Sequence, residues 1–241
     1  MPSGGSAAAR AAKRHRVGGR LALFDLDGTL LDGDTDELWC EFLMGEGVLD
    51  RASFEAGNRS VAERYAAGAI APAEFCAFYA ATLANRSAAQ WSPLRERFVA
   101  TAIAPRLGAA AHALVAGHRD AGDWLVLTTA TNRFLTEPIA GLLGVAAADL
   151  IATELEEGGG KFTGRNIGVL NMREGKVTRL AAWLQARGIA EAALADASFY
   201  SDSMNDLPLL RAVGRAIVVD PDERLRQEAE RMGWPVLSLA R

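Results

Sequence analysis

This 241-residue sequence has few cysteines, no long apolar run and only a small net charge. Its two cysteines, Cys40 and Cys76, cannot form a disulfide framework, and neither lies in a CxxC or CxxxxH spacing that zinc would require. No apolar run approaches the ~20 residues that a membrane helix needs, which argues against a membrane-spanning protein. The net charge of −4 gives no general reason to expect nucleic acid as a partner. We therefore expect a protein of the reducing cytoplasm.

Positive charge is concentrated at the N-terminus. Residues 1–20 carry five basic side chains and no acidic one, and removing that +5 from −4 leaves −9 on the rest of the chain. No apolar stretch of about 7–15 residues follows the basic residues, as a signal peptide would require. We expect 1–20 to be a disordered basic extension, with a weak contact to an anionic partner as the alternative. The acidic remainder predicts metal-assisted chemistry on a small molecule rather than phosphate-backbone binding.

Short apolar runs alternate with segments of helical period along most of the chain. The run at 21–24 shows little alternation, which is typical of a strand buried on both faces of a parallel sheet. Gly158–Gly160 lies between two extended pieces and predicts a hairpin turn. Strands separated by helices of about ten residues predict a Rossmann-like, doubly wound α/β fold. The other predicted strands are 124–128, 150–153, 197–201, 216–219 and 236–237, and the predicted helices are 105–122, 134–143, 177–187, 207–213 and 222–232.

The pattern differs between 36 and 103. Apolar residues such as Leu38 and Phe42 recur there at three and four residues, which is the helical period. Several glycines divide this stretch into short helices. We expect a helical cap inserted at 36–103, so that 21–35 and 104–241 form the α/β core.

Polar residues stand just after the predicted strands, where ligands of such sheets bind. Asp25 and Asp27 follow the first strand in the sequence Asp-Leu-Asp-Gly-Thr. Because the carboxyl ends of parallel strands meet at one edge of the sheet, we expect these residues to share a crevice with others placed in the same way. Those others are Thr129, Lys176, Asp202 and Asp206.

This set of residues suits the chemistry of a phosphate group. Several carboxylates in one crevice repel one another, and a bound cation relieves that repulsion. Carboxylate oxygens are hard ligands, so Mg²⁺ fits, and Mg²⁺ together with Lys176 would allow a phosphate dianion to bind. Asp25 could attack phosphorus and form an aspartyl phosphate, and Asp27 could protonate the leaving alcohol and later activate water. Thr129 and backbone amides would hold the phosphate oxygens, and Gly28 permits close backbone approach.

Each of these residues also has an ordinary structural interpretation. Asp27-Gly28 between two apolar runs is a strong hairpin signal. Lys176 by itself suits a solvated surface, and Asp202 and Asp206 suit a loop and the start of a helix. The occurrence of all four motifs in this order, each at a strand end or helix start, favours the catalytic interpretation.

With these motifs the sequence resembles the haloacid dehalogenase superfamily, in its phosphoserine-phosphatase-like branch, over about 21–234. The resemblance implies Asp25 as nucleophile, Asp27 as acid and base, and a Mg²⁺ ion held by Asp25, Asp202 and the backbone carbonyl of Asp27. The sequence departs from the family at Ser201, where a glycine usually precedes the fourth-motif aspartate. The residues that match the four motifs are Asp25, Asp27, Thr129, Lys176, Asp202 and Asp206.

Two residues are candidates for contact with the rest of the substrate, namely Asp34 and Asn205. Phosphoserine phosphatases place a glutamate nine residues after the nucleophile, where it meets the ammonium group of the substrate, and Asp34 stands at that position. Stretches such as 129–132 and 233–234 resemble a bacterial subgroup assigned as histidinol-phosphatases. Histidinol phosphate carries an ammonium and an imidazole group but no carboxylate.

The resulting hypothesis is a Mg²⁺-dependent phosphatase of a small phosphorylated metabolite. Histidinol phosphate is the expected substrate. Phosphoserine is the alternative, and its carboxylate would need a cation; the sequence leaves open whether Arg51, Arg59 or Arg64 supplies one. A phosphotransferase or mutase, and a receiver-like phosphoacceptor module, are the alternatives of other kinds. The sequence gives no indication of oligomeric state.

Overall fold

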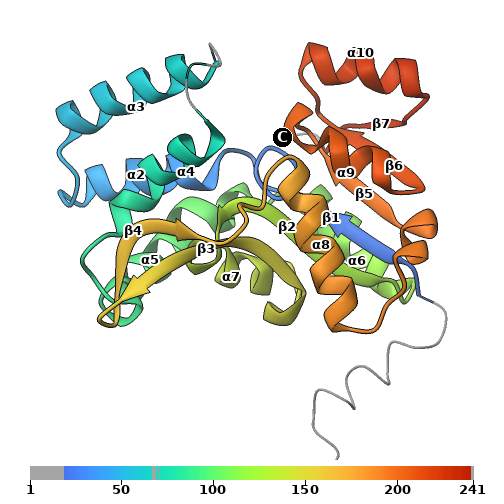
Figure 1. Cartoon of the computed structure of the whole chain (residues 1–241), viewed down its shortest axis with the longest axis horizontal. Helices are drawn as coiled ribbons and strands as arrows, with labels where there is room; N and C mark the ends of the chain where they lie inside the picture. Colours follow the sequence, from blue (N-terminus) through green and yellow to red (C-terminus); the bar gives the residue numbers. More distant parts are fainter. Residues whose placement is uncertain (1–18, 67–68, 70, 240–241) are drawn as a thin grey trace, which may run out of the picture.

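A seven-stranded sheet runs through the middle of the protein (Figure 1). The computed structural model describes residues 19–66, 69 and 71–239, so the extension expected over 1–20 lies outside the described residues except for Gly19 and Arg20. In spatial order the strands are β4 (Lys161–Ile167), β3 (Leu150–Gly158), β2 (Trp124–Asn132), β1 (Leu21–Phe24), β5 (Ser198–Ser201), β6 (Arg215–Val219) and β7 (Val236–Leu237).

Strand β1 is the point at which the chain changes direction across the sheet. It pairs in parallel with β2 on one side and with β5 on the other. The chain continues outward through β3 on the first side and through β6 and β7 on the second, all in parallel. Strand β4 is antiparallel to β3 and follows the predicted turn at Gly158–Gly160. The doubly wound α/β fold is therefore confirmed.

Helices cover both faces of this sheet because β1 is apolar on both sides. Leu21 and Leu23 belong to one buried cluster with side chains of α8, α9 and α10. Ala22 and Phe24 belong to a second cluster with side chains of α6 and α7. The helices are α6 (Ala109–Asp120), α7 (Arg133–Leu142), α8 (Glu174–Ala186), α9 (Leu207–Ala212) and α10 (Glu223–Met232).

Further helices occupy the segment expected to form a cap. Figure 1 shows α2, α3 and α4 together on the side of the molecule that also carries β3 and β4. Trp39 of α2 packs edge-on against Trp91 and Phe98 of α5, with ring centroids 5.7 and 5.1 Å away. The same cluster includes Phe24 of β1, so these helices share apolar packing with the sheet. The division at 36 and 103 stays a prediction. The helices are α2 (Thr35–Gly45), α3 (Arg51–Ala66), α4 (Pro72–Ala80) and α5 (Ala88–Phe98).

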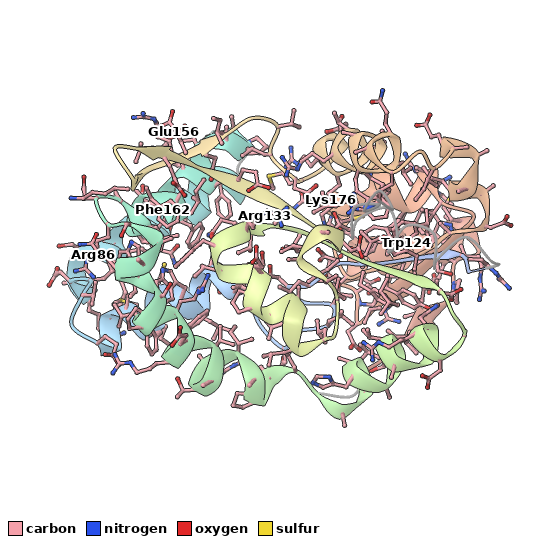
Figure 2. All side chains as sticks on the ribbon, turned by 90° about the horizontal axis from the view of Figure 1, so that it is seen from below. Arg86, Trp124, Arg133, Glu156, Phe162 and Lys176 are labelled. Carbon is pink, nitrogen blue, oxygen red and sulfur yellow. The ribbon has the colours of Figure 1, made fainter. Side chains whose placement is uncertain are left out.

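The β3–β4 hairpin is attached to this helical segment. The backbone N–H of Phe162 donates to the carbonyl of Arg86 at 3.0 Å, and the carbonyl of Phe162 accepts from Asn85 at 2.9 Å. The Phe162 ring also lies 5.1 Å from the ring of Phe134 in α7. Figure 2 shows Arg86 and Phe162 in the same part of the molecule, with Lys176 nearer its middle. The predicted strand 150–153 was too short, because pairing in the hairpin extends β3 to Gly158.

Two predicted helix boundaries were wrong for local reasons. Pro105 lies in a short 3₁₀ turn, and α6 begins only after Gly108, whose ψ of 159° is extended. Helix α8 begins at Glu174, directly after Arg173, whose φ of 52° lies in the left-handed region. Lys176 therefore lies within the first turn of α8.

No single helix among the described residues is both long and apolar enough to cross a membrane. The segments Ala88–Arg106 and Ala109–Asp120 meet that length and apolarity only when they are taken together, and a bend of 90° separates them.

Candidate active site

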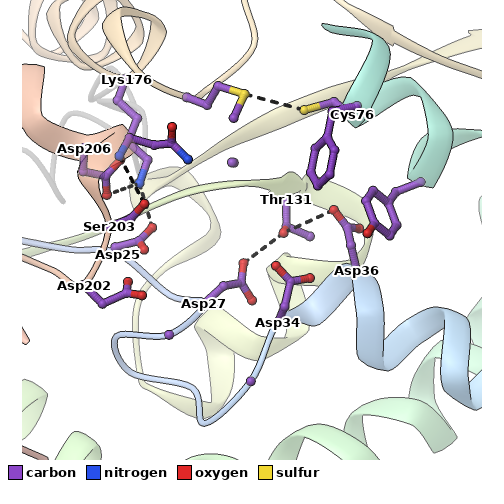
Figure 3. Close-up of a pocket in the computed structure, with 17 residues that line it drawn as sticks. Asp25, Asp27, Asp34, Asp36, Cys76, Thr131, Lys176, Asp202, Ser203 and Asp206 are labelled. Atoms are coloured by element: carbon purple, nitrogen blue, oxygen red, sulfur yellow. Dashed lines mark hydrogen bonds and ion pairs between the residues drawn. The ribbon is translucent and has the colours of Figure 1, made fainter. Parts of the chain in front are cut away.

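A cavity of about 310 Å³ lies at the carboxyl ends of β1, β2 and β5, where the sheet changes direction (Figure 3). It brings together most of the polar residues that the sequence singled out, with several that it did not. Six carboxylates and one lysine line it: Asp25, Asp27, Asp34, Asp36, Asp202, Asp206 and Lys176. Gly28, Phe75, Cys76, Tyr79, Thr131, Met172, Ser203 and Asn205 are also in its walls.

Lys176 joins two of these carboxylates. Its ammonium donates to Oδ1 of Asp25 at 2.7 Å and to Oδ2 of Asp206 at 2.6 Å. The lysine side chain is only 3% exposed, so the solvated surface position that suited it in isolation was the wrong interpretation. Ser201, which stands where the family usually has a glycine, donates from its hydroxyl to the same oxygen of Asp206 at 2.7 Å.

Burial and charge act in opposite directions on this group. Burial raises the pKa of Asp25 well above its ordinary value, and the ammonium of Lys176 works against that rise. Burial alone would lower the pKa of Lys176, but the carboxylates of Asp206 and Asp25 outweigh it and raise that pKa. Lys176 is therefore a permanent cation beside Asp25, suited to binding an anion at this end of the cavity.

Thr29 connects Asp25 with Asp202. Its hydroxyl donates to Oδ1 of Asp202 at 2.8 Å and lies 3.5 Å from Oδ2 of Asp25. Burial raises the pKa of Asp202 to about 6, and the nearby Asp206 carboxylate adds to the rise. Two crowded carboxylates with hard oxygen donors fit a Mg²⁺ ion. Among the described residues no three His, Cys, Asp or Glu side chains surround one metal position, so a metal here would also need the backbone carbonyl of Asp27.

Gly28 leaves room for this arrangement. Its φ is 72°, and a Cβ atom on it would stand 2.1 Å from Oδ2 of Asp202. Its backbone N–H donates to the carbonyl of Gly33 at 3.0 Å, which closes the loop after β1. Asp27 and Leu31 form an isolated parallel bridge, so this loop is not the antiparallel hairpin that Asp-Gly could also have indicated.

The carboxylate of Asp27 accepts hydrogen bonds from three threonines. Thr35 donates to Oδ1 from its backbone at 2.8 Å and also from its hydroxyl. Oδ2 accepts from Thr131 at 2.9 Å and from Thr129 at 3.2 Å. Because these donors lie at the start of α2 and on β2, they fix the Asp27 side chain between that helix and the sheet.

Thr129 lies close to the site but does not form part of the cavity wall. Its side chain is completely buried, and its hydroxyl donates to Asp27 and accepts from the backbone N–H of Thr131 at 3.2 Å. Ala130 and Thr131 face the cavity instead. The expected contact of Thr129 with phosphate therefore stays a prediction, whereas its contact with Asp27 is observed.

Both candidate substrate residues line the cavity. Asp34 caps the N-terminus of α2, where its Oδ1 accepts from the backbone of Glu37 at 3.0 Å. Dehydration by the cavity walls, followed by the charge of Asp27, raises the pKa of Asp34 to about 7. Asn205 accepts at Oδ1 from the guanidinium of Arg173 at 3.1 Å, which orients its amide at the rim.

The three arginines that could have met a substrate carboxylate lie elsewhere. Arg51 pairs with Glu55 at 2.9 Å, and Arg64 pairs with Glu74 at 2.8 Å. Neither these two residues nor Arg59 lines the cavity, and Lys176 is the one basic side chain among its described lining residues.

Asn171 positions the loop before Lys176 and was missed in the sequence. It is completely buried, and its amide nitrogen lies within 3.0 Å of the Thr128 hydroxyl and of the carbonyl oxygens of Thr129 and Ile151. It thereby ties β2 and β3 to the loop that leads into α8. A single asparagine in a loop carries no sequence signal for such contacts.

Comparison with known proteins identifies the family. Residues 22–211 match the family of haloacid dehalogenase-like hydrolases. The chain is 39% identical over 219 residues to a histidinol-phosphatase of Neisseria meningitidis serogroup C, covering 90% of this chain and 98% of that protein.

Solved structures show the same fold. A protein of unknown function from Bordetella pertussis Tohama I is 42% identical, with a TM-score of 0.86 over 92% of this chain and 99% of its own. A substrate-bound phosphoserine phosphatase is 18% identical, with a TM-score of 0.65 over 91% of this chain and 93% of its own. The chain therefore belongs to the haloacid dehalogenase-like hydrolase family, as an enzyme of its phosphatase class.

Proposed function

We propose that the protein hydrolyses a small phosphomonoester with the help of Mg²⁺, through an aspartyl phosphate on Asp25. The observation that carries this proposal is the buried ammonium of Lys176, 2.7 Å from Asp25 and 2.6 Å from Asp206 at the end of the central strand. It fixes Oδ1 of Asp25. Oδ2 of the same residue lies 3.5 Å from the Thr29 hydroxyl, whose proton the shorter 2.8 Å contact assigns to Asp202, and it is the oxygen we assign to attack.

Phosphate would bind between the cation and the backbone of the loop after β1. Lys176 supplies a fixed positive charge, and Gly28 lets the loop approach closely without a side chain. A Mg²⁺ ion held by Asp25, Asp202 and the carbonyl of Asp27 would neutralise the charge of the phosphate oxygens. Both cations are needed because the other charged groups among the described residues of the walls are carboxylates.

In the first half-reaction Oδ2 of Asp25 attacks phosphorus. A new bond forms between that oxygen and phosphorus, and the bond from phosphorus to the ester oxygen breaks. Asp27 gives a proton to the departing alkoxide. The contacts of Asp27 with Thr35 and Thr131 hold its carboxyl group in place for that transfer.

In the second half-reaction the resulting carboxylate of Asp27 takes a proton from water. The oxygen of that water attacks phosphorus, the bond to Asp25 breaks, and inorganic phosphate leaves. Asp27 finishes protonated, ready for another substrate. Because Asp27 acts first as an acid and then as a base, its carboxyl group must keep one orientation between the two steps. Its four hydrogen bonds hold it in that orientation.

We further propose histidinol phosphate as the substrate. Two facts support it over phosphoserine: the name of the relative that matches nearly the whole chain, and the lack of a second basic side chain among the described cavity residues. The carboxylate of phosphoserine would face Asp34 and Asp36 with no cation to offset the repulsion. The ammonium group of histidinol phosphate would instead be attracted to Asp34.

Phosphate release from histidinol phosphate, with and without Mg²⁺, tests this function. Asp25→Asn should lower kcat by a factor of about 10³ or more, because an amide is a poor nucleophile. Chelation with EDTA should abolish the activity, and added Mg²⁺ should restore it. The matched control is Asp120→Asn, which removes an exposed carboxylate on α6 and should change neither rate nor unfolding temperature.

Near-normal turnover by a folded Asp25→Asn variant would overturn the nucleophile assignment. Phosphate that leaves only when a second alcohol is supplied would indicate a phosphotransferase or mutase. A phosphorylated protein that persists for many minutes would indicate a receiver-like module.

A further inference from the structure

Asp36 lies across the cavity from the phosphate-binding end. Figure 3 shows Lys176, Asp25 and Asp202 on one side of the cavity and Asp36 with Thr131 on the other, with Asp34 between them. Asp36 is half-buried in the first turn of α2. None of the steps of hydrolysis requires a carboxylate at this place.

The contact between Thr131 and Asp36 leaves the aspartate without a full partner. The Thr131 hydroxyl lies 2.9 Å from Oδ2 of Asp27 and 3.5 Å from Oδ2 of Asp36. A hydroxyl has one proton to donate, and the shorter distance assigns it to Asp27. Asp36 therefore keeps hydrogen-bonding capacity on the cavity side of α2. Burial, with the charges of Asp34 and Asp27, raises the pKa of Asp36 well above its ordinary value, and a cation bound beside it would offset that rise.

The wall near Asp36 is aromatic as well as acidic. Phe75 and Tyr79 of α4 line the cavity and pack edge-to-face, with ring centroids 5.3 Å apart. The hydroxyl of Tyr79 donates to Asn58 at 2.9 Å, so its proton is not available to a ligand. An acid beside aromatic rings suits a flat, cationic nitrogen heterocycle, which packs on the rings and donates an N–H to the carboxylate.

We propose that Asp36 determines specificity by accepting a hydrogen bond from a cationic ring at the end of the substrate remote from phosphate. The inference rests on the proposed phosphatase function and deepens it. Asp34 takes the ammonium group next to the phosphate ester, and Asp36 takes the ring. The preferred substrate class is thus a short phosphate ester that carries both an amine and an imidazole-like ring.

Two substrates separate these roles. Histidinol phosphate carries the ammonium and the ring, whereas O-phosphoethanolamine carries the ammonium alone. Asp36→Asn should lower kcat/KM for histidinol phosphate by about tenfold or more relative to kcat/KM for O-phosphoethanolamine. The loss should come chiefly from a higher KM, because a charge-assisted hydrogen bond to the ring is removed. Asp34→Asn should weaken the binding of both substrates and leave the ratio of their kcat/KM values close to that of the wild type.

Glu41→Gln is the matched control, because Glu41 is an exposed acid on the same helix and does not line the cavity. It should leave the ratio unchanged. Asp36→Glu, which keeps the charge, should give a ratio between those of the wild type and Asp36→Asn, and it serves as the second variant if Asp36→Asn does not fold.

Histidinol without phosphate provides a readout that does not depend on its phosphate ester being a substrate. As a competitive inhibitor of p-nitrophenyl phosphate hydrolysis, it should bind about tenfold more weakly to Asp36→Asn. An unchanged inhibition constant, or an equal loss of kcat/KM for both phosphate esters, would overturn the role of Asp36. Failure of the phosphatase mechanism would appear separately, as retained activity in Asp25→Asn.

Discussion

Replacing Lys176 with methionine removes a charge and changes the shape of the buried side chain little. In the folded protein the ammonium contacts Asp25 and Asp206, and the lysine side chain is 3% exposed. Lys176→Met keeps an unbranched chain but leaves two buried carboxylates without their cation. The variant therefore tests whether this lysine stabilises the fold as well as the phosphate.

The expected loss in free energy of unfolding is about 3–5 kcal/mol, which is typical when one partner of a buried ion pair is removed. The total free energy of unfolding of a single domain is about 5–15 kcal/mol, so the variant should be only marginally stable. The loss should depend on pH. Burial already raises the pKa of Asp25, and removing the opposing Lys176 would raise it further.

The sign of the pH dependence follows from that raised pKa. A carboxyl group whose pKa is higher in the folded state binds its proton more tightly when the protein is folded. Its stabilising effect is complete at low pH and is lost as pH rises through the folded pKa. The deficit of Lys176→Met relative to wild type should thus be larger at pH 8 than at pH 5.

Urea unfolding followed by tryptophan fluorescence, in EDTA at both pH values, measures the deficit. The double variant Lys176→Met with Asp206→Asn should recover about 1–2 kcal/mol at pH 8, because it removes one of the two unpaired charges. The control is Lys161→Met, an exposed lysine at the start of β4, which should change stability by less than about 0.5 kcal/mol. A deficit under about 1 kcal/mol at pH 8, or one equal at both pH values, would refute the reasoning.

Two further changes probe the loop after β1 and the substrate end of the cavity. Gly28→Ala should lower kcat/KM about 100-fold or more and weaken stabilisation of the fold by Mg²⁺, because its Cβ would stand 2.1 Å from Oδ2 of Asp202 at a φ of 72°; a wild-type shift of the unfolding temperature with Mg²⁺ would contradict this. Burial and the charge of Asp27 place the pKa of Asp34 at about 7, so that Asp34 is ionised above that pH and neutral below it. The KM for histidinol phosphate should therefore rise by about tenfold as pH falls through 7 in the wild type, whereas Asp34→Asn should lack this change; parallel pH profiles would argue against an Asp34 contact with the amine.

The elements that the sequence predicted well are those whose burial is visible in local composition. The run Leu21–Phe24 is apolar at every position, and the structure buries all four residues on alternate faces of the sheet. The motif residues Asp25 and Asp202 follow directly from such strands, so their meeting at one edge could be predicted from topology alone. Boundaries were less well predicted where a single backbone angle decided them, as at Arg173 before α8.

The residues that sequence reasoning missed act through contacts between distant segments. Asn171 holds β2 and β3 together with one buried amide, and nothing about an isolated asparagine indicates that role. Asp36 looks like an ordinary acid in the first turn of a helix, where negative charge is favourable in any case. Only the position of α2 over the sheet makes it part of the cavity wall.

Helix α2 connects substrate recognition with the chemistry at phosphorus. Its first residue, Thr35, is buried and holds Oδ1 of Asp27, while Asp34 and Asp36 on either side of that threonine line the cavity. Thr131 of β2 holds the other oxygen of Asp27 and also approaches Asp36. The first turn of α2 therefore supplies both the acidic pair that lines the cavity and two of the four hydrogen bonds to Asp27, so a substitution that displaces this turn should affect recognition and chemistry together.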